Sequence, residues 1–376
     1  MSILSSLSAR QCTHPAWVEI DLSQFRKNIR AIRRRIGSCK FCFPVKGNAY
    51  GHGLCQIAKV AESEGVDCLG VAFLKEAVAL RLAGIEIPIL VFGAIHEDQI
   101  GDLIDLELEF SVSSRFKAEL VAAKCGELGK RCRVHLEIDT GIRRTGVRPE
   151  TAASLLQFLQ ETNCFEVVGV YSHFATADAP GDLFALQQIE QFRELRRQIH
   201  APSLIWHLAN SGGVMFYPES YFDMVRPGLA CYGYFPEGGK DPLGEIAPCL
   251  SLKARVSYFK VVGSNEGISY GHVYKTREQT RVVTVPLGYG DGYRRILSNR
   301  APVLVRGKRF RVSGAICMDQ FMVDIGSEEA FVGDEVTLIG KQGKEEISLW
   351  EISQLSSSIY NEMLCGLSER LPRIYR

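Results

Sequence analysis

The stretch FCFPVKGNAYGHG, residues 41–53, joins an apolar run to a loop that contains three glycines. The run FCFPV is typical of a strand that is covered on both faces. Lys46 stands where this run ends, although burial of an ammonium group costs free energy. A lysine at the end of a buried strand therefore raises the question of a chemical role.

Seven further apolar, β-branched runs follow along the chain, at residues 68–73, 87–92, 109–114, 134–139, 165–174, 203–210 and 221–228. Helical patterns stand between them, such as residues 74–84 and 114–129, which both end at a glycine, and residues 21–37 precede the first run. Eight such units predict an α/β fold, a (β/α)8 TIM barrel. The alternative is an open doubly wound sheet, which usually carries Gly-x-Gly-x-x-Gly after its first strand. The loop KGNAYGHG lacks that spacing.

The pattern changes after Cys249, where short alternating segments are separated by glycines. This change indicates a C-terminal, mostly antiparallel β domain. Residues 348–368 predict one or two helices, and the strand expected at 16–22 fits either domain. We therefore predict a barrel over residues 22–245 and a β-rich domain made of residues 1–21 and 246–376.

The composition is that of a globular protein, with 46% hydrophobic residues and a net charge of +1. Such a balance does not favour binding to nucleic acid or to an anionic membrane surface. No run reaches the ~18 apolar residues of a membrane span, and the N-terminus is too weakly basic for a signal peptide. Twelve cysteines in such a chain suggest reduced thiols and a cytoplasmic location. Cys39 and Cys42 lack a second pair, so we expect core packing there and no metal.

Polar residues follow several of the expected strands, where a barrel gathers its reacting groups at one rim. They are Lys46, Asn48, Tyr50, His52, Asp139, Arg143, Arg144, His173, Asn210, Ser211 and Arg226, and Gly228 follows the last strand with Arg226. Burial at such a rim disfavours the charged form of a lysine, and a neutral amine attacks carbonyls, including that of pyridoxal phosphate. The small residues of ANSGG (209–213) and RPGLA (226–230) suit a phosphate site at the last two strands.

The segment PVKGNAYGHG resembles the cofactor-lysine signature of the alanine racemase family. The resemblance continues through WVEIDLSQFRKNI, DTGIRRTG, YSHFATAD, HLANSGG, MVRPGLACYG, ISYGHVY, GYGDGY, ICMDQFMVDIG and LSERLPRIY. It implies a pyridoxal-phosphate enzyme that interconverts L-alanine and D-alanine, with the D-alanine used for peptidoglycan. It also implies a head-to-tail homodimer whose β domain completes the partner's active site.

The resemblance implies roles for individual residues. Lys46 would hold the cofactor and act as one base, and Tyr270 of the other subunit would be the second. Arg144 and the backbone of Met318 would bind the substrate carboxylate. The remaining cofactor contacts would come from Tyr50, His173, Asn210, Ser211, Arg226, Gly228, Leu229 and Tyr360. Racemisation removes the Cα proton from one face and returns it on the other, which two bases achieve without moving.

Three positions depart from the family pattern. Glu137 stands where many members have a lysine modified to a carbamate, and we expect its carboxylate to supply the same charge. Tyr360 precedes by one residue the place where a phosphate-binding tyrosine is expected, which Asn361 occupies. Ala315 replaces a common arginine and Gly47 a common alanine, so a racemase for serine or basic amino acids is an alternative. A pyridoxal-phosphate decarboxylase and a non-catalytic carrier are more distant alternatives.

Overall fold

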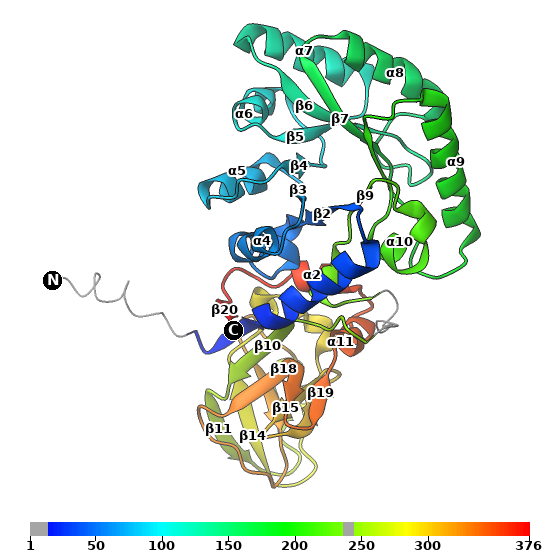
Figure 1. Cartoon of the computed structure of the whole chain (residues 1–376). Helices are drawn as coiled ribbons and strands as arrows, with labels where there is room; N and C mark the ends of the chain where they lie inside the picture. Colours follow the sequence, from blue (N-terminus) through cyan, green and yellow to red (C-terminus); the bar gives the residue numbers. More distant parts are fainter. Residues whose placement is uncertain (1–13, 236–243) are drawn as a thin grey trace, which may run out of the picture. The chain divides into compact units, whose positions relative to one another are not determined.

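The computed structural model describes residues 14–235 and 244–376. The chain forms two compact units (Figure 1). One unit is Ser23–Pro248, and the other combines Met1–Leu22 with Cys249–Arg376. The N-terminal segment thus belongs to the same unit as the C-terminal third of the chain.

The first unit is built on one sheet of eight parallel strands in the order β8-β7-β6-β5-β4-β3-β2-β9. The strands are β2 (Lys40–Pro44), β3 (Cys68–Val71), β4 (Ile89–Val91), β5 (Glu109–Val112), β6 (Cys132–Glu137), β7 (Phe165–Tyr171), β8 (Ile205–His207) and β9 (Met224–Val225). Between β8 and β9, the Asp223 N–H donates to the Trp206 carbonyl at 2.9 Å and the Arg226 N–H to the Ala209 carbonyl at 2.8 Å. These bonds bring the sheet close to closure, and the predicted eight-stranded barrel is confirmed.

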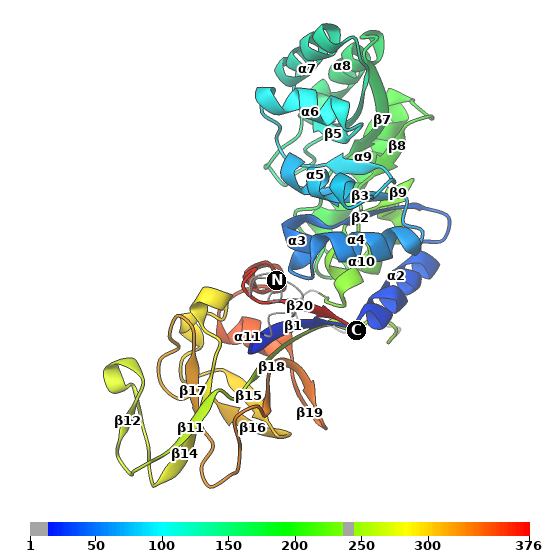
Figure 2. The ribbon, with the colours of Figure 1, turned by 90° about the vertical axis from the view of Figure 1, so that its left-hand side faces the viewer.

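Most helices lie on the outside of these strands, as Figures 1 and 2 show. The helical segments of this unit are α2 (Leu22–Ile36), α4 (Leu54–Ser63), α5 (Leu74–Leu82), α6 (Ile100–Asp105), α7 (Arg115–Leu128), α8 (Pro149–Glu161), α9 (Leu183–Ile199) and α10 (Ser211–Phe216), and α3 (Lys46–Tyr50) is a short left-handed turn at the end of β2. The ends of α7 show why the pattern predicted it: Ser114 Oγ accepts a hydrogen bond from the Lys117 N–H, and Gly129 ends the helix at φ 62°.

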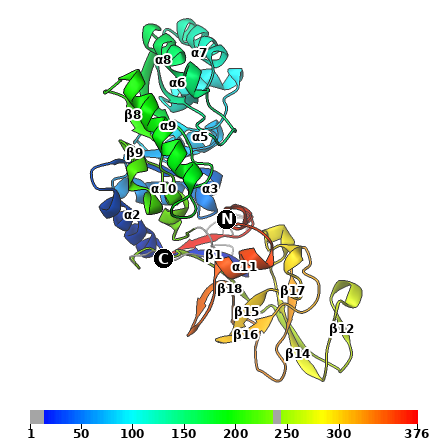
Figure 3. The same cartoon turned by 90° about the vertical axis from the view of Figure 1, so that its right-hand side faces the viewer.

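The second unit is mostly antiparallel, as predicted. Its main sheet has the order β16-β15-β18-β10-β1-β20, with β19 on β18, and a three-stranded sheet and a hairpin accompany it (Figure 3). The strands are β1 (Ala16–Ile20), β10 (Leu250–Arg255), β11 (Tyr258–Val262), β12 (Gly267–Ile268), β13 (Tyr274–Lys275), β14 (Thr280–Val285), β15 (Pro302–Val305), β16 (Lys308–Arg311), β17 (Phe321–Asp324), β18 (Glu335–Gln342), β19 (Glu345–Ile347) and β20 (Arg373–Tyr375).

Strand β1 pairs antiparallel with β10 and parallel with β20, which assigns the expected N-terminal strand to this unit. The stretch near the C-terminus forms two helices, α11 (Leu349–Leu355) and α12 (Tyr360–Cys365). Among the described residues, no helix has the length and apolar character needed to cross a membrane.

Candidate active site

Lys46 directly precedes a short left-handed turn at the end of β2. Gly47, Asn48 and Ala49 have φ values of 64, 55 and 53°, and Tyr50 has a φ of 50°. Each non-glycine residue in this conformation costs roughly 1–2 kcal/mol, and consecutive ones are rare. Such strain concentrates at functional sites, where the surrounding structure enforces it.

Hydrogen bonds on both sides hold this turn in place. The Gly47 N–H donates to Glu76 Oε1 at 2.7 Å, and the other oxygen of Glu76 accepts from the Ala72 N–H at 2.8 Å. On the far side, the Leu54 N–H donates to Asn48 Oδ1 at 2.8 Å. Glu76 in α5 was not among the predicted site residues, yet it ties the backbone beside Lys46 to the end of β3.

The segments after β8 and β9 approach the same turn. A methyl group added to Gly228 would lie 2.7 Å from the Tyr50 hydroxyl oxygen, so that hydroxyl lies against the Gly228 backbone. Ser211 Oγ accepts a hydrogen bond from the Ala230 N–H at 3.1 Å, which joins the two segments. Asn210 caps α10, because its Oδ1 accepts from the Gly213 N–H at 2.9 Å. The structure thus brings together Tyr50, Asn210, Ser211 and Gly228, and Leu229 follows directly.

Arg226 is buried just after β9 and donates hydrogen bonds in several directions. Its Nη2 lies 2.6 Å from the Ser172 carbonyl and 3.3 Å from His173 Nδ1, and its Nη1 lies 2.7 Å from His207 Nδ1. A guanidinium only donates, so Nδ1 of His173 accepts and the ring carries its proton on Nε2. Burial lowers the pKa of His173 well below its usual value, and the positive charges of Arg226, Arg144 and Lys46 act in the same direction. His173 is therefore a neutral imidazole.

Glu137 ends β6 inside the barrel. Its Oε1 accepts a hydrogen bond from the Thr145 hydroxyl at 2.6 Å. Burial raises the pKa of Glu137 above its usual range, although the Thr145 and Tyr171 hydroxyls and the positive charge of Arg144 oppose this rise. The ion pairs of the described residues do not include one between Glu137 and Arg144, so the two interact at longer range.

Tyr270, Met318 and Tyr360 belong to the other unit. The side chains of Tyr270 and Met318 are 72% and 53% exposed, and both line a hollow of about 650 Å³ that also contains Ser269, Gly271, His272, Cys317, Asp319, Gln320 and Met322. Tyr270 stands in a strained segment, because the non-glycine residues Ser269 and His272 have positive φ values of 65 and 45°.

Tyr360 is only 8% exposed, and its ring lies 5.8 Å from the ring of Trp350. Burial raises the pKa of its hydroxyl to about 12. Asn361, the next residue, is exposed.

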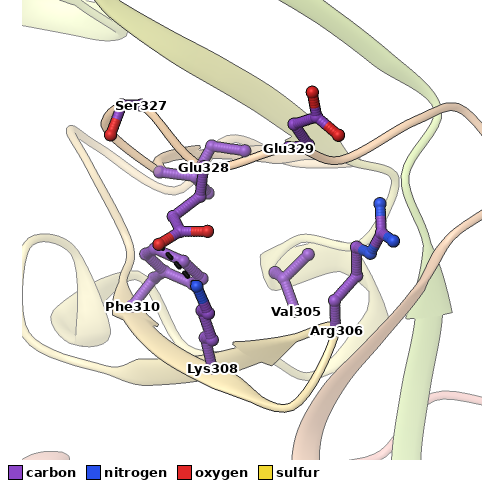
Figure 4. A pocket seen from close by; sticks show the side chains of 8 residues that line it. Val305, Arg306, Lys308, Phe310, Ser327, Glu328 and Glu329 are labelled. Carbon is purple, nitrogen blue, oxygen red and sulfur yellow. Dashed lines mark ion pairs between the residues drawn. The ribbon is translucent and has the colours of Figure 1, made fainter.

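A second hollow in this unit contains none of the predicted site residues (Figure 4). Val305, Arg306, Lys308, Phe310, Ile325, Ser327, Glu328 and Glu329 line it. Lys308 and Glu328 pair with each other at 2.6 Å, which leaves this hollow less suited to an anionic ligand.

Cys42 packs against Cys68 and Met224 in the barrel, as core packing requires. The sulfur of Cys39 instead donates to the Phe222 carbonyl at 3.6 Å. Across residues 14–235 and 244–376, no group of three histidine, cysteine or acidic side chains is placed to hold a metal ion.

Comparison with known proteins identifies both parts of the chain. Residues 20–236 match the family model "Alanine racemase, N-terminal domain", and residues 249–375 match "Alanine racemase, C-terminal domain". The alanine racemase of Symbiobacterium thermophilum is 40% identical over 96% of this chain and 97% of its own length, and that of Desulforamulus reducens is 39% identical over 96% and 99%.

Solved structures agree over nearly the whole chain. The alanine racemase from D-cycloserine-producing Streptomyces lavendulae superposes with a TM-score of 0.92 at 36% identity, covering 97% of this chain and 98% of that one. The enzyme from Bacillus anthracis with bound L-Ala-P also gives 0.92, at 34% identity, with 98% and 96% covered. Sequence, fold and rim geometry lead to one conclusion: the chain belongs to the alanine racemase family.

Proposed function

We propose that Lys46 and Tyr270 are the two bases with which this pyridoxal-phosphate-dependent isomerase interconverts L-alanine and D-alanine. The observation that carries the proposal is the gathering of Lys46, Tyr50, Ser211, Gly228 and Arg226 at the ends of β2, β8 and β9. Strands β2 and β9 are direct neighbours in the sheet. Barrel enzymes bind substrate at this end of their strands, often with a phosphate site at the last two.

The residues present fit pyridoxal phosphate. The close approach of Gly228 to the Tyr50 hydroxyl leaves no room for a side chain there. Tyr50 and Ser211 would hold the phosphate with hydroxyl groups, Gly228 and Leu229 with backbone N–H groups, and Tyr360 would be a further contact. Asn210 would support this cup through its cap on α10. When bound, the cofactor supplies the electron withdrawal that makes the substrate Cα–H acidic.

Arg226 would face the pyridine nitrogen of the cofactor, with neutral His173 beside the ring. A guanidinium stays protonated and donates hydrogen bonds, so it keeps that nitrogen in its unprotonated form. An unprotonated ring withdraws electrons less strongly, which disfavours side reactions such as transamination. This is the electrostatic setting that a racemase needs, because racemisation requires only a brief loss of the Cα proton.

The remaining groups orient the substrate and move its proton. One base takes the proton from one face of Cα, and the other returns a proton on the opposite face. Arg144 and the Met318 backbone would bind the substrate carboxylate. Glu137 would supply the negative charge near Arg144 and hold the loop through its bond to Thr145.

We further propose a head-to-tail homodimer in the cytoplasm that supplies D-alanine for peptidoglycan. Tyr270 and Met318 are well exposed on the second unit, although both would act on a substrate that must be shielded from water. A partner barrel that covers them would resolve this conflict and would complete each active site from two chains.

Borohydride reduction tests the role of Lys46. Borohydride should fix pyridoxal phosphate to one lysine of the loaded protein, and peptide mass spectrometry should find the label on Lys46. Lys46→Ala should lose the label and the activity, whereas Lys59→Ala, on the exposed face of α4, should keep both. A label on another lysine, or none in loaded protein, would overturn the assignment.

Substrate specificity requires a separate assay, because Gly47 and Ala315 depart from the family pattern. Racemisation of alanine, serine, lysine and arginine should be measured side by side, together with release of CO2. We expect alanine to react fastest and no CO2. A higher kcat/KM for serine or a basic amino acid would favour a racemase of different specificity on the same fold.

A further inference from the structure

A chain of buried polar side chains runs through the barrel interior to Arg226. Glu109 Oε2 lies 2.9 Å from His135 Nε2, and His135 Nδ1 lies 3.0 Å from His207 Nε2. His207 Nδ1 in turn lies 2.7 Å from Arg226 Nη1. Three hydrogen bonds thus join four residues, and each of the four is at most 5% exposed.

The two ends determine the direction of every hydrogen bond in this chain. Arg226 can only donate, so His207 Nδ1 accepts and the proton of that ring sits on Nε2. His207 therefore donates to His135 Nδ1, and the proton of His135 sits on its own Nε2. That proton points at Glu109, a carboxylate that can only accept. The hydrogen bonds therefore define which ring nitrogen donates and which accepts in both histidines.

The chain extends along the barrel from one mouth to the other. Glu109 opens β5 and is paired in the sheet with Arg133, whose Nη1 lies 2.9 Å from Glu109 Oε1 and whose side chain is 42% exposed. His135 stands level with Ser111, two residues further along the strands, and His207 stands level with Tyr171 at the end of β7. Arg226 follows β9 at the rim. Charge at the N-terminal mouth is thus connected to the C-terminal rim.

The electrostatics explain why this connection matters for Arg226. Within the described part of the chain, no carboxylate lies at ion-pair distance from this buried cation, and Glu137 acts on it only at longer range. A buried charge without a partner is costly, and a line of polarised hydrogen bonds can transmit a distant charge. Burial raises the pKa of Glu109, but the bond from His135 and the charge of Arg133 outweigh it and lower the net pKa, so Glu109 is ionised. Burial and Arg226 lower the pKa of His207, which keeps that ring neutral.

We propose that Glu109, His135 and His207 are positioning residues that hold the Arg226 guanidinium at the cofactor ring and supply its remote negative charge. This inference rests on the proposed role of Arg226. None of the three residues was predicted as part of the site, and none would touch substrate or cofactor. They would act through Arg226 by fixing its orientation and its donor strength.

Glu109→Gln tests the charge while it keeps the shape and an acceptor oxygen. We expect the dissociation constant for pyridoxal phosphate to rise about fivefold, the visible absorption band of the loaded enzyme to shift, and kcat to fall about tenfold. KM for alanine should change less than kcat, because the carboxylate site is separate.

The matched control is Val112→Ala. Val112 lies on the same strand but is offset by an odd number of positions, so it faces the helices and not the interior. The Val112→Ala substitution should lower the melting temperature without shifting the absorption band of the loaded enzyme. If Glu109→Gln and Val112→Ala give the same absorption band and the same cofactor affinity, the hydrogen-bond relay from Glu109 through His135 and His207 has no effect on Arg226, and the proposal is wrong.

A double-mutant cycle tests transmission through His135. If the charge of Glu109 reaches Arg226 through that ring, Glu109→Gln should change the absorption band in the natural protein and have no further effect in a His135→Leu background. Additive effects would contradict a relay. If Glu109→Gln and His135→Leu change only the melting temperature, the residues form a structural network and the proposal is wrong.

Nitrogen NMR of the unsubstituted protein tests the relay without any cofactor. The chain has eight histidines, and the signal of His207 should show a neutral ring protonated at Nε2. A positively charged His207, or one protonated at Nδ1, would overturn the hydrogen-bond direction. A protein with the expected tautomers that does not bind pyridoxal phosphate would instead contradict the proposed function.

Discussion

At the residue scale, two glutamates inside one barrel have opposite electrostatic settings. Glu109 accepts a hydrogen bond from His135 and forms an ion pair with Arg133, and its pKa lies below the usual value. Glu137 has a hydroxyl partner, Thr145, and its pKa is raised by burial. Ionised Glu109 therefore stabilises the fold, whereas ionised Glu137 costs stability. The second arrangement is expected of a group retained for function.

We predict that Glu137→Gln makes the protein more stable and less active. A carboxyl whose pKa is raised on folding favours the folded state at low pH, and this advantage is lost as pH rises from about 4.5 through the folded-state pKa. The amide avoids that loss and should gain about 0.5–1 kcal/mol at pH 7. Urea unfolding and alanine racemisation should be measured on the same samples. If the variant were fully active, the proposed role of Glu137 in the active site would be wrong.

We predict the opposite stability change for Glu109→Gln. A carboxyl whose pKa is lowered on folding stabilises the protein above its unfolded value of 4.5, and that contribution is lost as pH falls through the folded-state pKa. The variant should lose about 1–3 kcal/mol at pH 7, and the difference from the natural protein should shrink below pH 4.5. Urea midpoints between pH 4 and pH 8 measure this trend. A difference independent of pH would show that packing, not charge, is lost.

At the element scale, the left-handed turn after β2 explains the departure at Gly47. The φ of 64° there is free of strain for glycine but costs about 1 kcal/mol for alanine. We predict that Gly47→Ala lowers the free energy of unfolding by that amount and weakens pyridoxal phosphate binding, as urea and cofactor titrations would show. Gly126→Ala in α7 is the control, because it has open space and no positive φ, and it should be neutral or stabilising.

The elements themselves were largely predictable, because apolar runs and glycine stops are local signals. The range 114–129 predicted α7 because Ser114 and Gly129 are its caps. The polar barrel interior was missed. The run VHLEID places His135 and Glu137 two residues apart, hence on one face of the strand, but its overall apolar character hid that alternation. Which histidine meets which carboxylate depends on the register of four strands, and no single segment contains that information.

At the scale of the whole molecule, the expected site residues divide between the two units. Lys46 and nine others lie in the barrel unit, and Tyr270, Met318 and Tyr360 lie in the second. The sequence could identify both groups because the resemblance covers nearly the whole chain. It could not place them relative to each other, since subunit geometry depends on surfaces and not on local pattern. The exposure of Tyr270 is the observation that supports the proposed homodimer.

A composite site makes a quantitative prediction for mixed dimers. If Lys46 acts with the Tyr270 of the other subunit, Lys46→Ala and Tyr270→Phe homodimers should each be inactive. When the two are mixed under conditions that exchange subunits, random pairing makes half of the dimers mixed. Each mixed dimer contains one site in which both bases are intact, so about a quarter of the natural activity per chain should return.

Two controls sharpen this experiment. In the first control, the double variant Lys46→Ala, Tyr270→Phe is mixed with natural protein. The mixed dimers should have no intact site, so the activity per natural chain should fall below that of unmixed natural protein. If both bases came from one chain, the opposite pattern would appear: the two single variants would not complement, and each natural chain would stay active beside a double-variant partner. Only a site shared between chains gives both results. Two inactive single variants regain activity when they are mixed, and the natural protein loses activity when it pairs with the double variant.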